Sequence, residues 1–375
     1  MADGGGAPEV AGDRRAVLLV TKGLDLGGIE RVVVDLAVGL DRRGWPVEVA
    51  VVNERRGAFI PLLDDAGITV HRLGGGDHLG ARALGRLTRL IRQPRFGIVH
   101  VHGPLLAPWI RVAARRGRTA VVTTSHTPWE SLHPATRAAW RLTAPLDARA
   151  IAVSDAVASS LPGKVRARAT VVPHGVDPRV ATAATEAAAR RGPRTDSVFD
   201  AVAVASHRDA KNYPNLLRAV RVAIDRGVDL HLRAIGAGPG LEAHRRLAAE
   251  LGIDTAVTFE PPMLDVLDAI AAADLVVVAS DFEGQPLVVA EALAVGVPVV
   301  ATAVGRIPEL VDASVGVVVP TREPEALGEA IAALAFDDAR RTRMSTAATE
   351  AAHRWTLDDA LDAHEELYRA ASEQT

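Results

Sequence analysis

Short runs of apolar, mostly β-branched residues alternate with longer amphipathic stretches along the chain from residue 16 onward. Between the first two runs, apolar residues recur at helical spacing from Ile29 to Leu40, which predicts a helix with one apolar stripe. The alternation is typical of βαβ units, in which helices join parallel strands. The strands expected in the first half are Ala16–Val20, Pro46–Val52, Thr69–Leu73, Gly97–His102, Ala120–His126, Ala150–Ser154 and Thr170–Pro173.

The alternation stops over residues 178–198, which are small, polar or charged and include prolines, and it then restarts. The strands expected in the second half are Ala201–Ala205, Leu230–Ile235, Val257–Glu260, Leu275–Ala279, Val297–Ala301 and Val315–Val319. We therefore predict an α/β protein with two doubly wound, Rossmann-like domains, residues 14–180 and 199–352, joined by a linker over 181–198.

The two ends of the chain differ from this pattern. Residues 1–13 are Gly-rich and polar and are expected to be a disordered tail, whereas residues 353–375 predict a last helix that can cross back to the first domain. Because ligands of open parallel sheets bind beyond the carboxyl ends of the strands, the active site is expected in a cleft between the two domains.

Composition narrows the class of protein. The hydrophobic fraction of 48% and the charged fraction of 24% are those of a globular protein, and the first apolar run is too short for a signal peptide or an anchor. The chain has no cysteine, which is compatible with a reducing compartment, so we expect a cytoplasmic protein. Charge is uneven: residues 1–180 hold 25 basic and 16 acidic residues, and residues 181–375 hold 18 and 30.

The most informative stretch runs from Ser280 to Thr302. A buried strand is expected to end just before it, and a helix to begin near Pro286. Glu283 precedes that helix and Glu291 lies within it, so both carboxylates can face one cleft, while Gly284 allows a ligand to approach the backbone closely. The free amides at the helix start are suited to binding a phosphate.

This stretch resembles the Glu-x7-Glu motif of the retaining family-4 glycosyltransferases of the GT-B fold. Further segments fall in the order of that family: Gly27–Arg31, Val99–His102, Ile151–Ser154, Val171–Asp177 and Ile235–Pro239. The resemblance implies that Glu283 contacts hydroxyls of the transferred sugar and that Glu291 contacts the ribose. It also implies that Gly284, Pro286 and Leu287 belong to the donor site.

Two other loops are expected to hold the donor diphosphate. Gly27 and Gly28 precede a helix without the dinucleotide Gly-x-Gly-x-x-Gly spacing, which argues against a dehydrogenase, and in the resembled family these glycines approach the phosphates. In the loop Ala205–Asn212, Lys211 matches a phosphate-binding lysine, but Ser206 stands where the family has an arginine. Either Arg208 supplies the missing charge, or Ser206 and backbone amides suffice with one cation.

Histidines mark the side of the cleft formed by the first domain. His126 comes at the end of an expected strand and matches the family's histidine beside the transferred sugar, so His126, Glu283 and Lys211 are the expected catalytic residues. His100 and His102 are expected to point to opposite faces of the sheet, which leaves His102 as the candidate on the acceptor side. His174 is interpreted as an interdomain turn residue.

These features predict a retaining hexosyltransferase that moves a hexose or N-acetylhexosamine from a UDP- or GDP-sugar to an acceptor hydroxyl. The alternatives are a GT-B nucleotide-sugar epimerase or phosphorylase, or a non-catalytic nucleotide-sugar-binding protein. No metal-binding spacing is present, so we expect no metal and no cofactor, the nucleotide sugar being a substrate. The expected partners are this donor and a small-molecule or lipid-linked acceptor, with no nucleic acid.

One basic segment leaves membrane contact open. Arg82, Arg86, Arg89 and Arg92 lie at helical spacing and predict a basic helix face. The apolar stripe of this helix is narrow and lacks an aromatic residue, so packing on the sheet is favoured over peripheral membrane binding.

Overall fold

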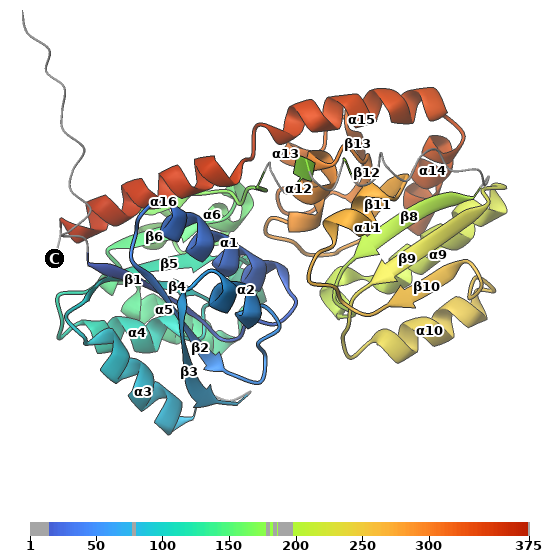
Figure 1. Ribbon diagram of the computed structural model, residues 1–375. Coiled ribbons are helices and arrows are strands. Elements are labelled where there is room, and N and C mark those ends of the chain that lie inside the picture. Colours follow the sequence, from blue (N-terminus) through green and yellow to red (C-terminus); the bar gives the residue numbers. More distant parts are fainter. Residues whose placement is uncertain (1–14, 77–79, 178–180, 183–185, 187–197, 374–375) are drawn as a thin grey trace, which may run out of the picture.

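The computed structural model describes residues 15–76, 80–177, 181–182, 186 and 198–373. It contains two parallel sheets, one in each lobe of the molecule (Figure 1). The first sheet has the order β3-β2-β1-β4-β5-β6-β7, and the second has the order β10-β9-β8-β11-β12-β13. The predicted α/β fold with two Rossmann-like domains is therefore confirmed.

Each strand expected from the sequence is present, with small shifts of its ends. The strands of the first sheet are β1 Ala16–Thr21, β2 Val47–Asn53, β3 Thr69–Gly75, β4 Phe96–His102, β5 Ala120–Ser125, β6 Arg149–Ala152 and β7 Ala169–Val171. Those of the second sheet are β8 Phe199–Val204, β9 Leu230–Ile235, β10 Val257–Glu260, β11 Leu275–Val278, β12 Val299–Thr302 and β13 Gly316–Val319. Because β5 ends at Ser125, His126 is the first residue of the following loop rather than the last residue of the strand.

Helices cover both faces of each sheet. The helices of the first domain are α1 Gly28–Arg42, α2 Ile60–Asp65, α3 Ala81–Ile91, α4 Ala107–Ala114, α5 Pro134–Thr143, α6 Asp155–Ser160 and α7 Gly163–Arg166. Those that follow β8 are α9 Tyr213–Asp225, α10 Leu241–Glu250, α11 Leu267–Ala271, α12 Leu287–Ala294, α13 Ile307–Leu310, α14 Pro324–Ala335, α15 Asp338–Ala352 and α16 Leu357–Ser372. None of the helices formed by these described residues is long and apolar enough to cross a membrane.

The last helix, α16, lies along the first domain although it follows the second in sequence (Figure 1). Leu361 and Tyr368 are buried in the core between α1 and the first sheet, and Leu361 packs against Gly39 of α1. Arg43 at the end of α1 pairs with Asp358, Asp362 and Glu365 of α16. Burial of this apolar stripe holds the end of the chain on the first domain.

Two segments cross between the domains side by side. The backbone amide of Val176 donates to the carbonyl of Trp355, and the amide of Leu357 donates to the carbonyl of Val176. The predicted tail over 1–13 lies outside the described residues, as does most of the predicted linker over 181–198.

Candidate active site

The carboxyl ends of the two sheets face each other, and the loops beyond them are in contact. Gly28 at the start of α1 lies beside Leu287 at the start of α12. Gly284 packs on the backbone of His126, so closely that a Cβ atom at Gly284 would lie 2.0 Å from the His126 carbonyl oxygen. Only glycine fits this position, and the contact joins the loop after β5 to the loop after β11.

Lys211 and Glu283 are brought together from two loops of the second domain. Lys211 Nζ lies 2.5 Å from Glu283 Oε1, and the same oxygen accepts a hydrogen bond of 2.7 Å from the Ser280 hydroxyl. Both side chains are largely buried, so their attraction is less screened than that of a surface pair. The residue predicted to bind the diphosphate, Lys211, and the residue predicted to bind the sugar, Glu283, are therefore in direct contact in the cleft.

The loops after β8 and β11 are also fixed by contacts that the sequence did not single out. Asn212 donates a side-chain hydrogen bond of 2.8 Å to Asp281, and the Asp281 amide donates to the carbonyl of Ala210. Asn212 has a φ of 42°, a left-handed conformation that asparagine tolerates better than most residues. These contacts hold Lys211 in position against Glu283.

Ser206 and Arg208 occupy the start of the loop after β8. Ser206 is partly buried, and its carbonyl accepts a hydrogen bond from the Arg208 amide. The Arg208 side chain is exposed, and its charge acts across the cleft on Glu30 of α1. Glu30 folds back over Gly27, at the amide-rich start of that helix, and burial raises the pKa of its carboxyl group. Arg208 and the Gly27–Gly28 loop therefore lie near one another.

Glu291 lies in a pocket between the domains. The pocket contains about 300 Å³ of space between atoms, part of it open to solvent, and its lining includes Arg31 and Asp35 of α1. Arg31 donates two hydrogen bonds, of 2.8 and 3.0 Å, to Asp35. Burial raises the pKa of Glu291 to about 7, an effect that the charge of Arg31 partly opposes. The sequence motif included Arg31, but nothing in it indicated that Arg31 and Asp35 face Glu291.

Histidines of the first domain form a continuous row below the cleft. His102 Nδ1 lies 3.1 Å from His126 Nε2, and His126 Nδ1 lies 3.3 Å from His174 Nε2. At the other end, the two ring nitrogens of His100 lie 2.6 Å from the Tyr368 hydroxyl and from the Thr124 hydroxyl. Burial lowers the pKa of His126 to about 3 and lowers the pKa values of His100, His102 and His174. All four rings are therefore neutral at pH 7.

The expectation that His100 and His102 point to opposite faces was wrong. The two ring centroids are 4.1 Å apart, because residues two positions apart in a strand lie on the same face. His102 is buried behind His126 and does not line the pocket described next, so its contact with the cleft runs through His126.

His174 connects the two domains directly. Its backbone amide donates 2.8 Å to Gln285 Oε1, and Gln285 Nε2 donates 2.7 Å to the His174 carbonyl. The His174 ring stacks on His126 at the same time. His174 thus couples the position of His126 to the loop that contains Glu283 and Gly284, a link between residues that are far apart in sequence.

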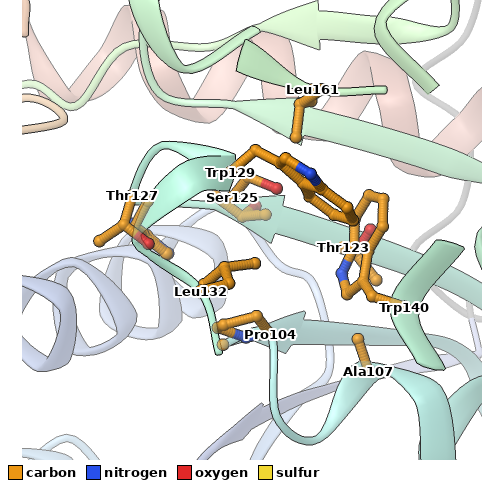
Figure 2. Close-up of a pocket in the computed structure, with 12 residues that line it drawn as sticks. Pro104, Ala107, Thr123, Ser125, Thr127, Trp129, Leu132, Trp140 and Leu161 are labelled. Carbon is orange, nitrogen blue, oxygen red and sulfur yellow. The ribbon is translucent and has the colours of Figure 1, made fainter. Parts of the chain in front are cut away.

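A narrow pocket opens beside His126 in the first domain. It contains about 350 Å³ of space between atoms, part of it open to solvent, and Figure 2 shows the indole of Trp129 among its lining side chains. Trp129 and Trp140 meet edge to face. The lining side chains are hydroxyl, aromatic and aliphatic groups, with His126 among them: Pro104, Ala107, Thr123, Thr124, Ser125, Thr127, Trp129, Leu132, Trp140 and Leu161.

Below this pocket, Arg111 is fully buried. Its guanidinium group binds both carboxylate oxygens of Asp147 and also contacts the Thr123 hydroxyl and the Trp140 carbonyl. Its charge is thus neutralised by an ion pair. Across the part of the chain that the structure describes, His, Asp and Glu side chains do not gather in a group of three or more that could hold a metal ion.

The arrangement of the two domains is shared with solved glycosyltransferases of the GT-B fold. Anabaena HepE in complex with UDP-glucose superposes with a TM-score of 0.82 at 20% identity, over 94% of this chain and 99% of that one. Sucrose-phosphate synthase from Thermosynechococcus elongatus superposes with a TM-score of 0.78 at 18% identity, over 96% and 100%. At these identities the likeness defines the fold, which is GT-B.

Sequence relatives place the chain more narrowly. Residues 26–180 match the model of Glycosyltransferase Family 4, and residues 186–351 match that of Glycosyl transferases group 1. A D-inositol 3-phosphate glycosyltransferase from Xylanimonas cellulosilytica is 30% identical over 93% of each chain. A protein of the same name from Saccharomonospora viridis is 39% identical, over 42% of this chain and 39% of its own length. The chain belongs to the family-4 glycosyltransferases, and it is a glycosyltransferase that uses a nucleotide-sugar donor.

Proposed function

We propose that the protein is a retaining glycosyltransferase that moves a hexose or N-acetylhexosamine from a UDP- or GDP-sugar to an acceptor hydroxyl bound beside His126. The observation that carries this proposal is the Lys211–Glu283 pair, which lies in the same interdomain cleft as the contact between Gly284 and His126. Lys211 would bind the donor diphosphate, Glu283 the hydroxyls of the sugar, and Glu291 the ribose.

Charge stabilisation accounts for the chemistry. The bond between the sugar C1 and the diphosphate oxygen breaks, and the acceptor oxygen forms the new bond to C1 on the same face of the sugar. The acceptor proton passes to the departing diphosphate, whose charge is stabilised by Lys211 and by the amides at the start of α1. Glu283 is bound by Lys211 and Ser280, which suits a carboxylate that positions the sugar rather than one that attacks it.

Arg208 is the proposed second cation on the diphosphate. Its charge already acts on Glu30 at the start of α1, where the phosphates would approach. Arg208→Ala should weaken UDP binding about as much as Lys211→Ala, whereas Arg218→Ala, an exposed arginine on α9, should leave it unchanged. Equal affinity of the wild type and Arg208→Ala would instead favour a site with one cation and Ser206.

The names of the relatives suggest an inositol phosphate as a second candidate acceptor. The pocket beside His126 favours an uncharged acceptor, because Lys and Arg do not occur among its described lining residues and His126 is neutral at pH 7. A buried phosphate without a cationic partner is costly, whereas aromatic and hydroxyl groups suit a sugar or polyol.

The experiment is a donor screen followed by an acceptor screen. Thermal shifts with UDP, GDP, ADP and dTDP identify the nucleotide, and donor hydrolysis without acceptor separates a transferase from a non-catalytic binding protein. Transfer to inositol, inositol phosphate and octyl glucoside then tests the acceptor class, and the anomeric configuration of the product, read by NMR, tests retention. Donor binding without hydrolysis or transfer would contradict the proposed function.

A further inference from the structure

Several large apolar side chains are exposed on α4 and α5 of the first domain, two helices that pack against one another. Of the nine large hydrophobic residues that are exposed among the described residues, five fall within one segment of the chain, on α4, at the end of α5 and in the turns beside them. They are Leu105, Trp109, Val112, Leu142 and Leu146, and we call them the α4–α5 surface. Leu142 is 82% exposed and Val112 is 57% exposed, so the protein's own core covers little of either side chain.

The exposed apolar side chains of α4 are additional to those that this helix buries in the core. On α4, Ile110, Ala113 and Ala114 are buried, while Trp109 and Val112 lie three residues apart on the opposite side. Helix α4 therefore carries apolar residues both on the side that faces the core and on the side that faces solvent. Large exposed apolar side chains that are grouped on neighbouring elements are found at interaction surfaces of soluble proteins.

The same region of the chain is strongly basic. Residues 80–146 contain eleven arginines and a single acidic residue, Glu130. Among the described residues, only Arg95 and Arg111 of these arginines pair with a carboxylate. The charges of the other nine arginines are not cancelled by ion pairs with described residues.

The basic helix α3 packs beside α4. Leu87, Leu90 and Ile91 of α3 are buried, so this helix packs its apolar stripe inward and leaves Arg82, Arg86 and Arg89 exposed. The Trp109 indole donates a hydrogen bond of 3.0 Å to the Thr88 hydroxyl on α3, which joins the two helices. The aromatic residue that α3 lacks in its own sequence is thus supplied by α4.

We propose that the α4–α5 surface and the arginines of α3 dock the protein on an anionic lipid membrane. The arginines would be attracted to lipid phosphates, Trp109 would lie at the level of the headgroups, and Leu142 and Val112 would enter the acyl boundary. A nucleic acid would also attract the arginines, but it offers no apolar layer for these aliphatic side chains. This proposal does not depend on the assigned roles of Lys211, Glu283 or Glu291.

Docking in this orientation has a consequence for the acceptor. Pro104 and Ala107 line the pocket beside His126, and they alternate along the chain with Leu105 and Trp109 of the α4–α5 surface. The segment that would meet the membrane therefore also forms a wall of the pocket. This placement would give a lipid-linked acceptor a short path to the cleft.

The test is sedimentation of the full chain with vesicles of phosphatidylcholine alone or of phosphatidylcholine mixed with phosphatidylglycerol, at low and at physiological salt. We expect binding to the mixed vesicles only, weaker at the higher salt because screening reduces the attraction. A Val112→Ser, Leu142→Ser double variant should lower the bound fraction at least fivefold. Phe336→Ser, which changes an exposed apolar residue of the second domain, should not.

Charge variants provide the second arm. A triple variant, Arg82→Gln, Arg86→Gln, Arg89→Gln, should abolish binding to the vesicles. A control triple variant, Arg218→Gln, Arg245→Gln, Arg343→Gln, changes exposed arginines of the second domain and should preserve binding. Because all these side chains are exposed, unchanged thermal unfolding serves as the check on folding. No binding to anionic vesicles at low salt would overturn the proposal, as would variants that bind like the wild type. Retention on a polyanionic oligonucleotide without vesicle binding would overturn it in favour of a nucleic-acid surface.

Discussion

Lys211 Nζ lies 2.5 Å from Glu283 Oε1, so the cation assigned to the diphosphate and the carboxylate assigned to the sugar neutralise one another across the loops after β8 and β11. Both groups are largely buried, and a buried ion that loses its partner is left uncompensated. A donor that brings its diphosphate to Lys211 and its hydroxyls to Glu283 would replace one set of charge-assisted hydrogen bonds by another.

Replacing either member of this pair should have different effects on binding and on transfer. Lys211→Ala should weaken UDP binding by about 1.5–3 kcal/mol, roughly ten- to a hundredfold, which calorimetry can measure. Glu283→Ala should lower transfer more than nucleotide affinity, because it leaves the cation in place. Lys164→Ala, an exposed lysine on α7, is the matched control. Unchanged UDP affinity in Lys211→Ala would contradict its assignment to the diphosphate.

Glu291 should make nucleotide binding depend on pH near neutrality. The pKa of Glu291 is raised to about 7, so its carboxylate forms only as the pH rises through that value. A carboxylate accepts hydrogen bonds from ribose hydroxyls better than a neutral carboxyl group does. UDP affinity of the wild type should therefore rise between pH 6 and pH 8, whereas that of Glu291→Gln should stay flat. A parallel rise in the variant would assign the titration to another group.

The same group should affect stability with the opposite trend. Because burial raises its pKa above the unfolded value, the neutral Glu291 stabilises the fold below about pH 4.5, and this contribution is lost as the pH rises to about 7. Glu291→Gln should therefore gain in free energy of unfolding relative to the wild type between pH 5 and pH 8, by no more than about 3 kcal/mol. Urea unfolding at the two pH values measures the difference. A Glu291→Gln variant whose free energy of unfolding falls relative to the wild type between pH 5 and pH 8 would contradict the burial of this carboxylate.

Gly284→Ala should push the loop after β11 away from the loop after β5 on the other domain. The added Cβ would lie 2.0 Å from the His126 carbonyl oxygen, so the loop after β11 must move away. We expect kcat/KM to fall at least tenfold. Gly85→Ala is the control: nothing lies within 4 Å of its Cβ, and in the middle of α3 alanine should add about 0.5–1 kcal/mol to the free energy of unfolding. Full activity in Gly284→Ala would show that this contact is not needed for transfer.

His126 should act in its neutral form. Burial lowers its pKa to about 3, so kcat at saturating donor should show no histidine ionisation between pH 5 and pH 9. His126→Ala should lower kcat and leave the Kd for UDP unchanged, and His353→Ala, an exposed histidine after α15, should change neither. A loss of kcat around pH 6 that disappears in His126→Ala would show that the cleft does not keep this ring neutral.

Transfer should continue in the presence of EDTA. The proposed charge stabilisation comes from Lys211, Arg208 and the amides at the start of α1, all supplied by the protein. The prediction is checked by initial rates of transfer measured without EDTA, with EDTA, and with EDTA followed by excess magnesium. Complete loss of activity that magnesium restores would overturn it.

The sequence by itself determined the two sheets and the motif that faces the cleft. Apolar runs with turn residues between them specify parallel strands locally, and the position of Gly284 between Glu283 and the following helix is a local property of one loop. Hydrophobic periodicity similarly indicated α16 through Leu361 and Tyr368. For these features the neighbours along the chain carry the information.

Only the tertiary structure decided which residues meet across loops and domains. The pairing of Lys211 with Glu283, the placement of Arg31 and Asp35 beside Glu291, and the link from His126 through His174 to Gln285 join residues that are 48 to 260 positions apart. The position of Trp109 beside the arginines of α3 depends likewise on how two helices pack on one sheet. Such contacts follow from packing the apolar faces of distant elements together, and the local spacing of residues does not encode that packing.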